Sequence, residues 1–194
     1  MKLPEIETKG KMSLEEAILK RRSRRKFDER PLDLKQLSQL LWSVQGKLGE
    51  KRSRAVPSAG ATFPLEVYAV VGNVEGVEAG LYRYDIEKHA IDLIGEGDLR
   101  EALCGAALSQ KFIAQAPATI VIAADYIRTS QRYGERAERY VHMEVGHAGQ
   151  NVYLECESLG LGTCAVGAFD DAAVKAFLRI EEEPLYLLPV GYAK

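Results

Sequence analysis

The sequence has few cysteines and no long hydrophobic run. Its three cysteines, Cys104, Cys156 and Cys164, are well separated and form no CxxC pair, which excludes a disulfide framework. The longest uncharged apolar stretch, residues 113–124, covers about a dozen positions, whereas a transmembrane helix needs about 18 or more. The polar N-terminus, MKLPEIETKGK, lacks the apolar run of a secretory signal. We therefore expect a soluble, cytoplasmic protein with no membrane partner.

Several familiar catalytic motifs are missing as well. His142 and His147 are five residues apart, which places them about 140° apart around a helix, unlike the pair in HExxH. No PCxxC follows His142, and there is no Walker A, GxGxxG or GxSxG sequence. We therefore expect no metal site and no kinase or common hydrolase chemistry. A nucleophilic pair of Cys164 and His147 stays open, although buried cysteines are mostly inert.

The composition is that of an ordinary globular domain. The 194 residues are 46% apolar and 28% charged, which excludes a disordered or fibrous chain and predicts one domain over residues 1–194. The net charge of −2 is unevenly distributed: residues 1–60 hold 15 Lys and Arg against 8 Asp and Glu, and residues 61–194 hold 11 against 20. Six of the seven residues 20–26 are basic. Such a run is typical of a solvated helix end, a nucleic-acid patch or an anion site.

Hydrophobic periodicity and capping signals predict a mixed α/β chain of the α+β class. Ser13 and Glu16 have the spacing of a capping box, as do Asp33 and Gln36, so helices are expected from residues 14 and 34. Further helices are expected after Asp98, over residues 135–159 as one long helix ended by the glycine turn 160–162, and after Asp170. Strands are expected at residues 66–71, 80–84, 90–94, 118–124 and 185–192.

Four distant segments make chemical sense together. Residues 21–25 carry four arginines and a serine, and guanidinium groups bind phosphate bidentately while a hydroxyl adds a neutral bond. Residues 57–61 are small, which lets the backbone approach a planar ligand, although Ser58 and Gly60 could form only a turn. Residues 165–168 form an apolar turn of small residues after the long helix. Residues 188–192 form the last segment. Together they indicate a site for a phosphorylated, planar molecule.

These segments resemble the FMN-dependent nitroreductase family, closest to the SagB-type branch that includes azoline oxidases. The resemblance spans nearly the whole chain and rests on RRSRRKF (21–27), PSAGATFP (57–64), GHAGQN (146–151), LGLG (159–162) and PVGY (189–192). It implies a nitroreductase-like fold: a central, mostly antiparallel sheet flanked by helices, with a long central helix. It also implies a homodimer that binds FMN between its subunits.

The resemblance assigns a role to each matching position. The positions that hold the FMN phosphate and ribityl chain are matched by Arg21, Arg22, Ser23 and Arg25. The segment that reaches the flavin of the partner subunit is matched by Pro57, Ser58, Ala59 and Gly60. One face of the isoalloxazine is covered at the positions of Ala165 and Val166, and its N5 and O4 edge meets the backbone N–H groups at Gly167 and Ala168.

Two positions depart from better-known relatives. Ala61 stands where many nitroreductases have asparagine. Azoline oxidases carry a catalytic Lys-Tyr pair before the long helix, and the similar place here holds Arg132 and Tyr133, so the lysine is absent. The resemblance makes Tyr133 a candidate catalytic residue in addition to the Gly167 N–H, although Tyr133 and Tyr140 are more often packing residues than catalytic ones.

The implied activity is the reduction of a small-molecule acceptor, a quinone, a nitroaromatic or a related compound, with NAD(P)H as electron donor in a ping-pong mechanism. The flavin carries the chemistry and the protein supplies orientation and electrostatics. The alternative is a SagB-type dehydrogenase or oxidase acting on a peptide heterocycle or another small molecule. A nucleic-acid-binding role of residues 20–26 with Arg52 and Arg54 is a remote alternative, because no stacking aromatics interleave the basic run. We therefore expect no nucleic-acid partner.

Overall fold

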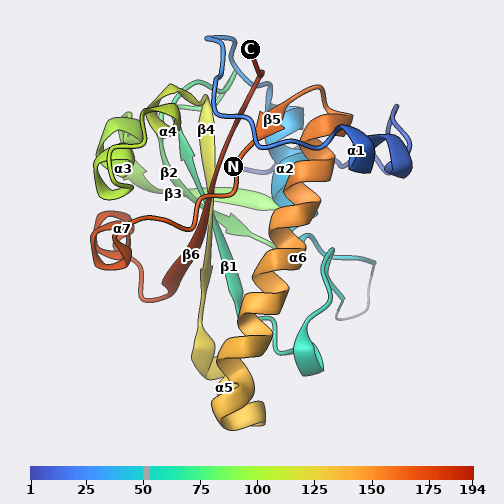
Figure 1. Ribbon diagram of the computed structural model, residues 1–194, viewed down its shortest axis with the longest axis vertical. Helices are drawn as coiled ribbons and strands as arrows, with labels where there is room; N and C mark the ends of the chain where they lie inside the picture. Colours follow the sequence, from blue (N-terminus) through green and yellow to red (C-terminus); the bar gives the residue numbers. More distant parts are fainter. Residues whose placement is uncertain (50–52) are drawn as a thin grey trace.

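The computed structural model describes residues 1–49 and 53–194 (Figure 1). Its strands are β1 (Leu65–Val71), β2 (Gly80–Asp85), β3 (Ala90–Glu96), β4 (Ala118–Ala124), β5 (Gly162–Thr163) and β6 (Glu183–Gly191). Within the described residues they form one six-stranded sheet in the order β3-β2-β1-β4-β6-β5, and every neighbouring pair is antiparallel. The predicted antiparallel sheet and α+β class are confirmed.

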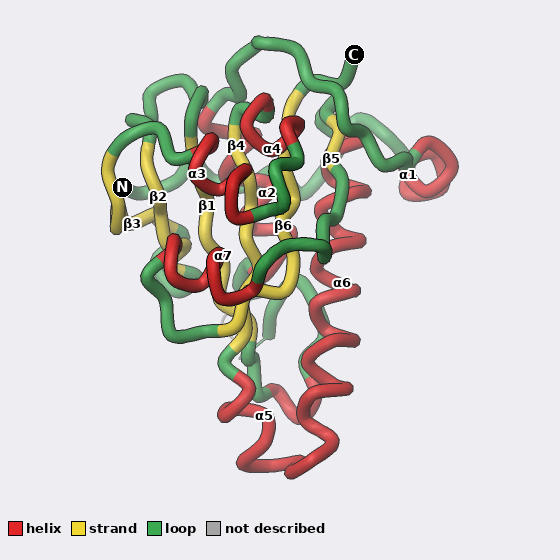
Figure 2. The backbone as a smooth tube through the Cα atoms, turned by 60° about the vertical axis from the view of Figure 1, so that its left-hand side comes forward, coloured by secondary structure: helices red, strands yellow, loops and turns green. Residues whose placement is uncertain are grey.

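Helices lie on both faces of this sheet (Figures 1 and 2). They are α1 (Leu14–Lys20), α2 (Leu34–Gln45), α3 (Arg100–Ala106), α4 (Lys111–Gln115), α5 (Tyr126–Tyr133), α6 (Ala137–Ser158) and α7 (Asp171–Leu178), with 3-10 turns η1 (Ala59–Ala61) and η2 (Gly134–Arg136). None of the helices in residues 1–49 and 53–194 is both long and apolar enough to span a membrane.

Alternating side chains of the central strands belong to two separate hydrophobic cores. Val67 of β1 and Ile122 of β4 belong to the core under α2 and α6. Their neighbours Tyr68 and Val121 belong to the core under α3, α4 and α7. Because successive residues of a strand point to opposite faces, both cores come from the same apolar runs. β1 and β4 are buried at every position, as expected for central strands covered on both sides.

The local capping signals hold in most places. Asp33 and Gln36 form the predicted capping box at the start of α2, and Asp170 caps α7. Gly160, at φ +70°, ends α6: its N–H donates to Glu157 O and the next N–H to Cys156 O, the pattern of a Schellman motif.

Three expectations differ from the structure. α3 begins one residue later than Asp98 implied, with Leu99 at the N-cap; the Asp98 carboxylate still accepts the Arg100 backbone N–H at 3.2 Å and also pairs with the Arg100 guanidinium. In α1 only Ala17 of the expected apolar positions is buried, whereas Leu14 and Ile18 are 60% and 55% exposed.

The long helix is shorter than expected and has a companion. α6 covers Ala137–Ser158, and the residues before it form η2 and the separate helix α5, which was not predicted. α5 begins after Asp125, whose carboxylate accepts the Ile127 N–H, and it buries only Thr129. α5 has only eight residues, too few for an apolar periodicity to identify a helix from the sequence. Figure 2 shows α5 beside the start of α6, beyond the end of the sheet.

Candidate functional site

The basic segment 21–25 directly follows the last turn of α1. The Arg22 guanidinium donates to two backbone carbonyls of that turn, at 2.8 and 3.0 Å, and so fixes the direction in which the chain leaves the helix. Ser23 then pairs with Thr163 of β5 as an isolated parallel bridge, and the Arg24 N–H donates to Thr163 O at 2.8 Å. The segment is therefore anchored at the edge of the sheet, with Arg25 exposed to solvent.

Tyr153 of α6 joins this segment to the turn that follows β5. Its hydroxyl oxygen lies 2.9 Å from Ser23 Oγ and accepts the Ala165 N–H at 2.8 Å. The Arg21 guanidinium carbon stands 5.0 Å from the centre of the Tyr153 ring, in cation–π geometry. Two of the four segments are thus brought together around one side chain that the sequence analysis did not single out.

The turn 165–168 presents two free backbone donors. Val166 is locked to Leu187 of β6 by a reciprocal pair of hydrogen bonds of 2.8 and 3.0 Å. Gly167 and Ala168 are exposed, and no group in the described part of the chain accepts a hydrogen bond from either N–H. The Ala168 carbonyl accepts from Gln110 Nε2 at 2.8 Å, which holds the far end of the turn. Two adjacent N–H groups on a fixed backbone can donate to the edge of a planar ligand. The last segment, 188–192, lies at the end of β6 and mainly fills the core.

The loop 57–63 has an unusual backbone. Gly60, Ala61 and Phe63 all adopt positive φ, at +58°, +53° and +48°. A Cβ at position 60 would lie 2.6 Å from the Tyr133 hydroxyl, so a glycine is required there by both conformation and space. Ser58 Oγ accepts the Phe63 N–H at 2.9 Å and closes the loop on itself.

Helix α5 holds this loop from outside. Arg132 Nη1 donates to the Gly60 carbonyl at 3.0 Å, and the hydroxyls of Thr62 and Thr129 lie 2.9 Å apart. Tyr133 packs edge-on against Tyr140 of α6, with ring centres 5.0 Å apart. The candidate Tyr133 is therefore beside the loop, in a packing contact, and its neighbour Arg132 is engaged with loop backbone.

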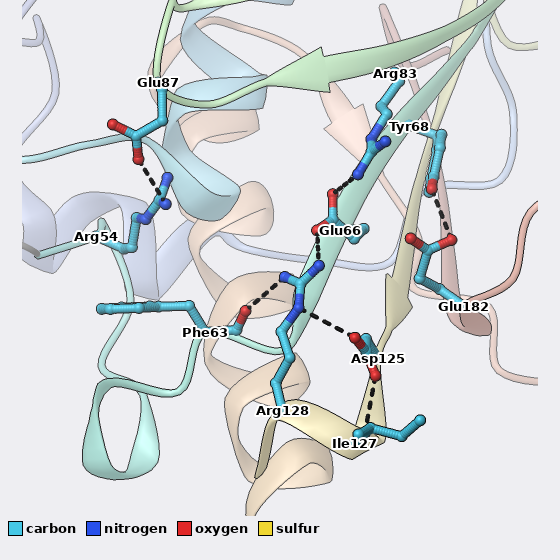
Figure 3. A network of polar contacts seen from close by, with 10 residues as sticks. All are labelled: Arg54, Phe63, Glu66, Tyr68, Arg83, Glu87, Asp125, Ile127, Arg128 and Glu182. Atoms are coloured by element: carbon cyan, nitrogen blue, oxygen red, sulfur yellow. Dashed lines mark hydrogen bonds and ion pairs between the residues drawn. The ribbon is translucent and has the colours of Figure 1, made fainter.

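A polar network ties α5 and the loop to the sheet (Figure 3). Arg128 donates to the Phe63 carbonyl at 3.0 Å and to the Glu66 carboxylate of β1 at 2.6 Å, and it also pairs with Asp125. The other oxygen of Glu66 accepts from Arg83 of β2 at 2.9 Å. Because Glu66 is nearly buried, these bonds fix the exit of the loop relative to two strands.

A buried carboxyl group lies under the same loop. Glu144 of α6 is 2% exposed and accepts from Gln45 Nε2 at 3.1 Å and from the Ser58 hydroxyl. Burial raises the pKa of Glu144 to about 7, and these two hydrogen bonds counteract only part of the effect. Ser58 thus connects the loop to an ionisable group inside the protein.

The two halves of the predicted site are separate within one chain. The loop is attached to α6 at Glu144, and the segments around Ser23 and Ala165 are attached at Tyr153, nine residues later. Nine residues correspond to a rotation of about 180° and a rise of about 13 Å along a helix. The two attachments therefore point to opposite sides of α6. They also lie at different heights along it: Figure 1 shows α1 beside the C-terminal end of α6 and the segment with η1 beside its N-terminal half.

Other groups considered in the sequence have ordinary roles. Arg54 pairs with Glu87 at 2.9 Å, and Arg52 lies outside the described residues. Cys164 is buried and its thiol contacts the Ala165 carbonyl, whereas His147 is exposed. In residues 1–49 and 53–194 no group of three or more His, Cys, Asp or Glu could hold a metal ion.

Tyr153, Glu144 and Arg128 were not predicted from the sequence as site residues, and Arg132 was noted there only as the replacement of a lysine. A signal was present for Tyr153, because a tyrosine between the buried positions 152 and 156 of a long helix places its hydroxyl at the border of the core. Glu144 carried a similar signal as an acid on the predicted apolar face. Their partners, however, lie far away in sequence.

Known proteins resemble this chain over most of its length. The profile of the nitroreductase family matches residues 18–192. A protein of Methanocaldococcus jannaschii named "Putative nitroreductase" is 50% identical over 191 residues, which cover 98% of this chain and 95% of that protein. A solved structure from Ralstonia eutropha with the same description has 32% identity and a TM-score of 0.84, covering 99% of this chain and 88% of its own.

A third relative is named for the processing of trifolitoxin. The trifolitoxin-processing protein TfxB of Rhizobium leguminosarum bv. trifolii is 30% identical over 140 residues. The match covers 69% of this chain and 37% of TfxB, so the aligned region is a minor part of that longer protein.

Proposed function

This chain belongs to the nitroreductase family, and we propose that it is a cytoplasmic, FMN-dependent oxidoreductase that uses NAD(P)H to reduce a small-molecule acceptor. The observation that carries the proposal is the cluster around Tyr153. There the phosphate-binding candidates Arg21 and Ser23 meet the turn whose Gly167 and Ala168 amides are unengaged within the described residues.

The residues present fit FMN at both of its ends. Arg21 and Ser23 offer a fixed positive charge and a hydroxyl to a phosphate dianion, and exposed Arg25 adds a second charge two residues on. Gly167 and Ala168 offer N–H donors to acceptor atoms of a ring edge, and Ala165 would cover one ring face without bulk. The Val166 side chain, which the resemblance also assigns to that face, is only 5% exposed and packs in the core, so only its backbone could approach a ring. When bound, FMN supplies the redox chemistry by accepting a hydride and passing the electrons on.

Each of the chain's own groups has a defined task in this reaction. Arg21, Ser23 and Arg25 would bind and orient the phosphate end, and Arg22, whose guanidinium is held by its own turn, would contribute through its main chain. The Gly167 N–H would donate to the reacting edge of the ring and, because Val166 is locked to β6, would need no reorganisation to do so. Small residues at 165–168 on one face of the ring would leave its other face open, and donor and acceptor would then use that face in turn, in a ping-pong sequence. An open apolar face favours a broad range of acceptors such as quinones and nitroaromatics.

The separation of the half-sites supports a further part of the proposal, a homodimer with two flavin sites. One chain holds Pro57, Ser58, Ala59 and Gly60 on one side of α6 and the phosphate-binding segment on the other, so a second copy completes each site. Surfaces for this contact are available: Leu14, Ile18 and Leu19 of α1 are 55–74% exposed. Met143, Gly146 and Gln150 also form an exposed stripe at helical spacing on α6.

The likeness to TfxB supports one alternative, a SagB-type flavin dehydrogenase acting on a peptide heterocycle or another small molecule. The chemistry of Arg132 argues against this alternative. A guanidinium group does not give up its proton in proteins, and this one is occupied by the Gly60 carbonyl, so it cannot replace the lysine of the azoline oxidases.

The decisive experiment is spectroscopic. The purified protein should be yellow, release FMN on denaturation, and lose its visible absorbance when mixed anaerobically with NADH or NADPH in a stopped-flow instrument. A quinone or a nitroaromatic should then restore the absorbance. Double-reciprocal plots of steady-state rate against nicotinamide concentration, at several acceptor concentrations, should be parallel. Protein that takes up no flavin would refute the proposal. Flavoprotein that neither nicotinamide reduces would favour the TfxB-like alternative.

A further inference from the structure

Tyr153 occupies a position from which it touches both ends of the proposed cofactor site. Its hydroxyl accepts the Ala165 N–H at 2.8 Å and lies 2.9 Å from Ser23 Oγ. Ser23 Oγ and Ala165 N are therefore within about 6 Å of each other, held by one oxygen atom. The ring of the same side chain packs against Arg21, whose guanidinium carbon lies 5.0 Å from the ring centre.

The hydrogen positions around this oxygen can be counted. An amide N–H can only donate, so Tyr153 accepts from Ala165. Of the two hydroxyl hydrogens of Tyr153 and Ser23, one is used between these two groups. The second hydroxyl hydrogen is left to donate outward, on the exposed side of the pair, where Ser23 lies. The Arg21 guanidinium lies over the ring of the same tyrosine.

The direction of the shared hydrogen bond follows from cooperativity. Accepting the Ala165 N–H polarises the Tyr153 hydroxyl and makes it the better donor to Ser23 Oγ. Ser23 then accepts from Tyr153 and turns its own hydrogen outward. A phosphate monoester dianion presents only acceptor oxygens, and it would meet an O–H donor beside a fixed positive charge.

We propose that Tyr153 is a positioning residue for the flavin phosphate: its hydroxyl sets Ser23 as an outward donor and its ring holds Arg21, both relative to the turn that begins at Ala165. This inference rests on the proposed function, because it takes FMN as the ligand. It predicts discrimination between FMN and riboflavin, which share the ring and the ribityl chain and differ in the phosphate.

The test measures dissociation constants of FMN and riboflavin on apo-protein by quenching of flavin fluorescence. Tyr153→Phe keeps the ring under Arg21 and removes only the hydroxyl. We expect it to weaken FMN binding by about 10-fold or more, the usual effect of a hydrogen bond to a charged group, and riboflavin binding by less than about 3-fold. Tyr126→Phe is the matched control, since it deletes a hydroxyl bonded to His142 at 2.7 Å, away from the site, and should change neither constant.

Ser23→Ala provides an independent second variant. It deletes the outward donor and leaves the Tyr153–Ala165 bond, so it should show the same FMN-selective loss of affinity. The double variant should bind FMN no more weakly than the single variant with the lower FMN affinity. Equal losses for FMN and riboflavin in Tyr153→Phe, or additive losses in the double variant, would overturn the proposal. Parent protein that binds neither flavin would instead refute the proposed function on which it rests.

Discussion

Arg132 donates a hydrogen bond of 3.0 Å to the carbonyl of Gly60, a glycine with positive φ in the loop that the family resemblance assigns to the flavin of the partner subunit. Gly60 has little freedom of its own, because Tyr133 occupies the space beside its Cα. α5 therefore fixes the shape of a loop that it does not belong to.

Arg132→Ala should loosen this loop. We expect flavin affinity to fall by about 5-fold, the effect of losing one hydrogen bond. The loss should be the same for FMN and riboflavin, because we propose that the loop approaches the ring and not the phosphate. Titration of both flavins measures this, with Arg136→Ala on the adjacent exposed turn as control. An FMN-selective loss would show that Arg132 acts on the phosphate and contradict this role for the residue.

The arginines of the basic segment give a second prediction. Replacing Arg21 or Arg25 by Ala removes a charge-assisted contact to the phosphate, worth about 1.5–3 kcal/mol, and should lower FMN affinity by about 10–100-fold. Arg22→Ala serves as a comparison, since that side chain is tied to its own turn and its loss should be smaller. Unchanged FMN affinity in the Arg21→Ala, Arg25→Ala double variant would remove residues 21–25 from the site.

Glu144 gives a prediction about pH. Its pKa is about 7 in the folded protein and near 4.5 when exposed, so the folded state binds a proton that the unfolded state has already released. The contribution of this group to stability is therefore fully present below about pH 4.5 and is lost as the pH rises through 7. Over that window the loss is about 3 kcal/mol at most.

Urea denaturation of the parent and of Glu144→Gln at pH 5.5 and pH 8 measures this contribution. The glutamine imitates the protonated carboxyl group and cannot ionise, so the variant should gain stability relative to the parent as the pH rises. The other titrating groups are common to both proteins, so their contributions cancel in the difference between the two free energies of unfolding. A difference between the two proteins that does not change with pH would mean that Glu144 does not titrate in this range.

The parts of the structure that the sequence predicted depend on local interactions. The β4 strand, the Asp33–Gln36 box and the Gly160 turn are each specified by a few neighbouring residues, and the structure confirms them. α5 was not predicted because its eight residues are too few to show an apolar periodicity, and its contacts, such as Arg132 to Gly60, join residues far apart in the sequence. Apolar spacing alone also misjudged α1, whose Leu14 is exposed in the single chain.

The site was predictable in its segments and not in its connections. Ser23 and Tyr153 are 130 residues apart, and Gln45 and Glu144 are 99 apart. No periodicity or motif encodes such pairs, since they arise only when β5 and α2 have packed beside α6. The division of the site between opposite sides of α6 likewise appears only when both attachments are seen on one helix.

The final prediction concerns Gly167, whose exposed N–H has no acceptor in the described part of the chain and which we propose as the donor to flavin N5. Gly167→Pro deletes this N–H. The residue before it, Val166, is paired with Leu187 in an extended conformation that a following proline tolerates. If the donor acts as oxyanion-hole donors do, flavin reduction by NADH or NADPH should slow by about 100-fold.

Gly167→Ala is the matched control for this variant. An added Cβ would meet Tyr186 at 3.5 Å, an ordinary contact, and the N–H would remain, so reduction should proceed at the parent rate. Flavin content is measured in each preparation, which separates loss of cofactor from loss of rate. A proline variant that retains its flavin and is reduced as fast as the alanine variant would exclude the Gly167 N–H as the N5 donor, and the adjacent free N–H of Ala168 would then be the group to test.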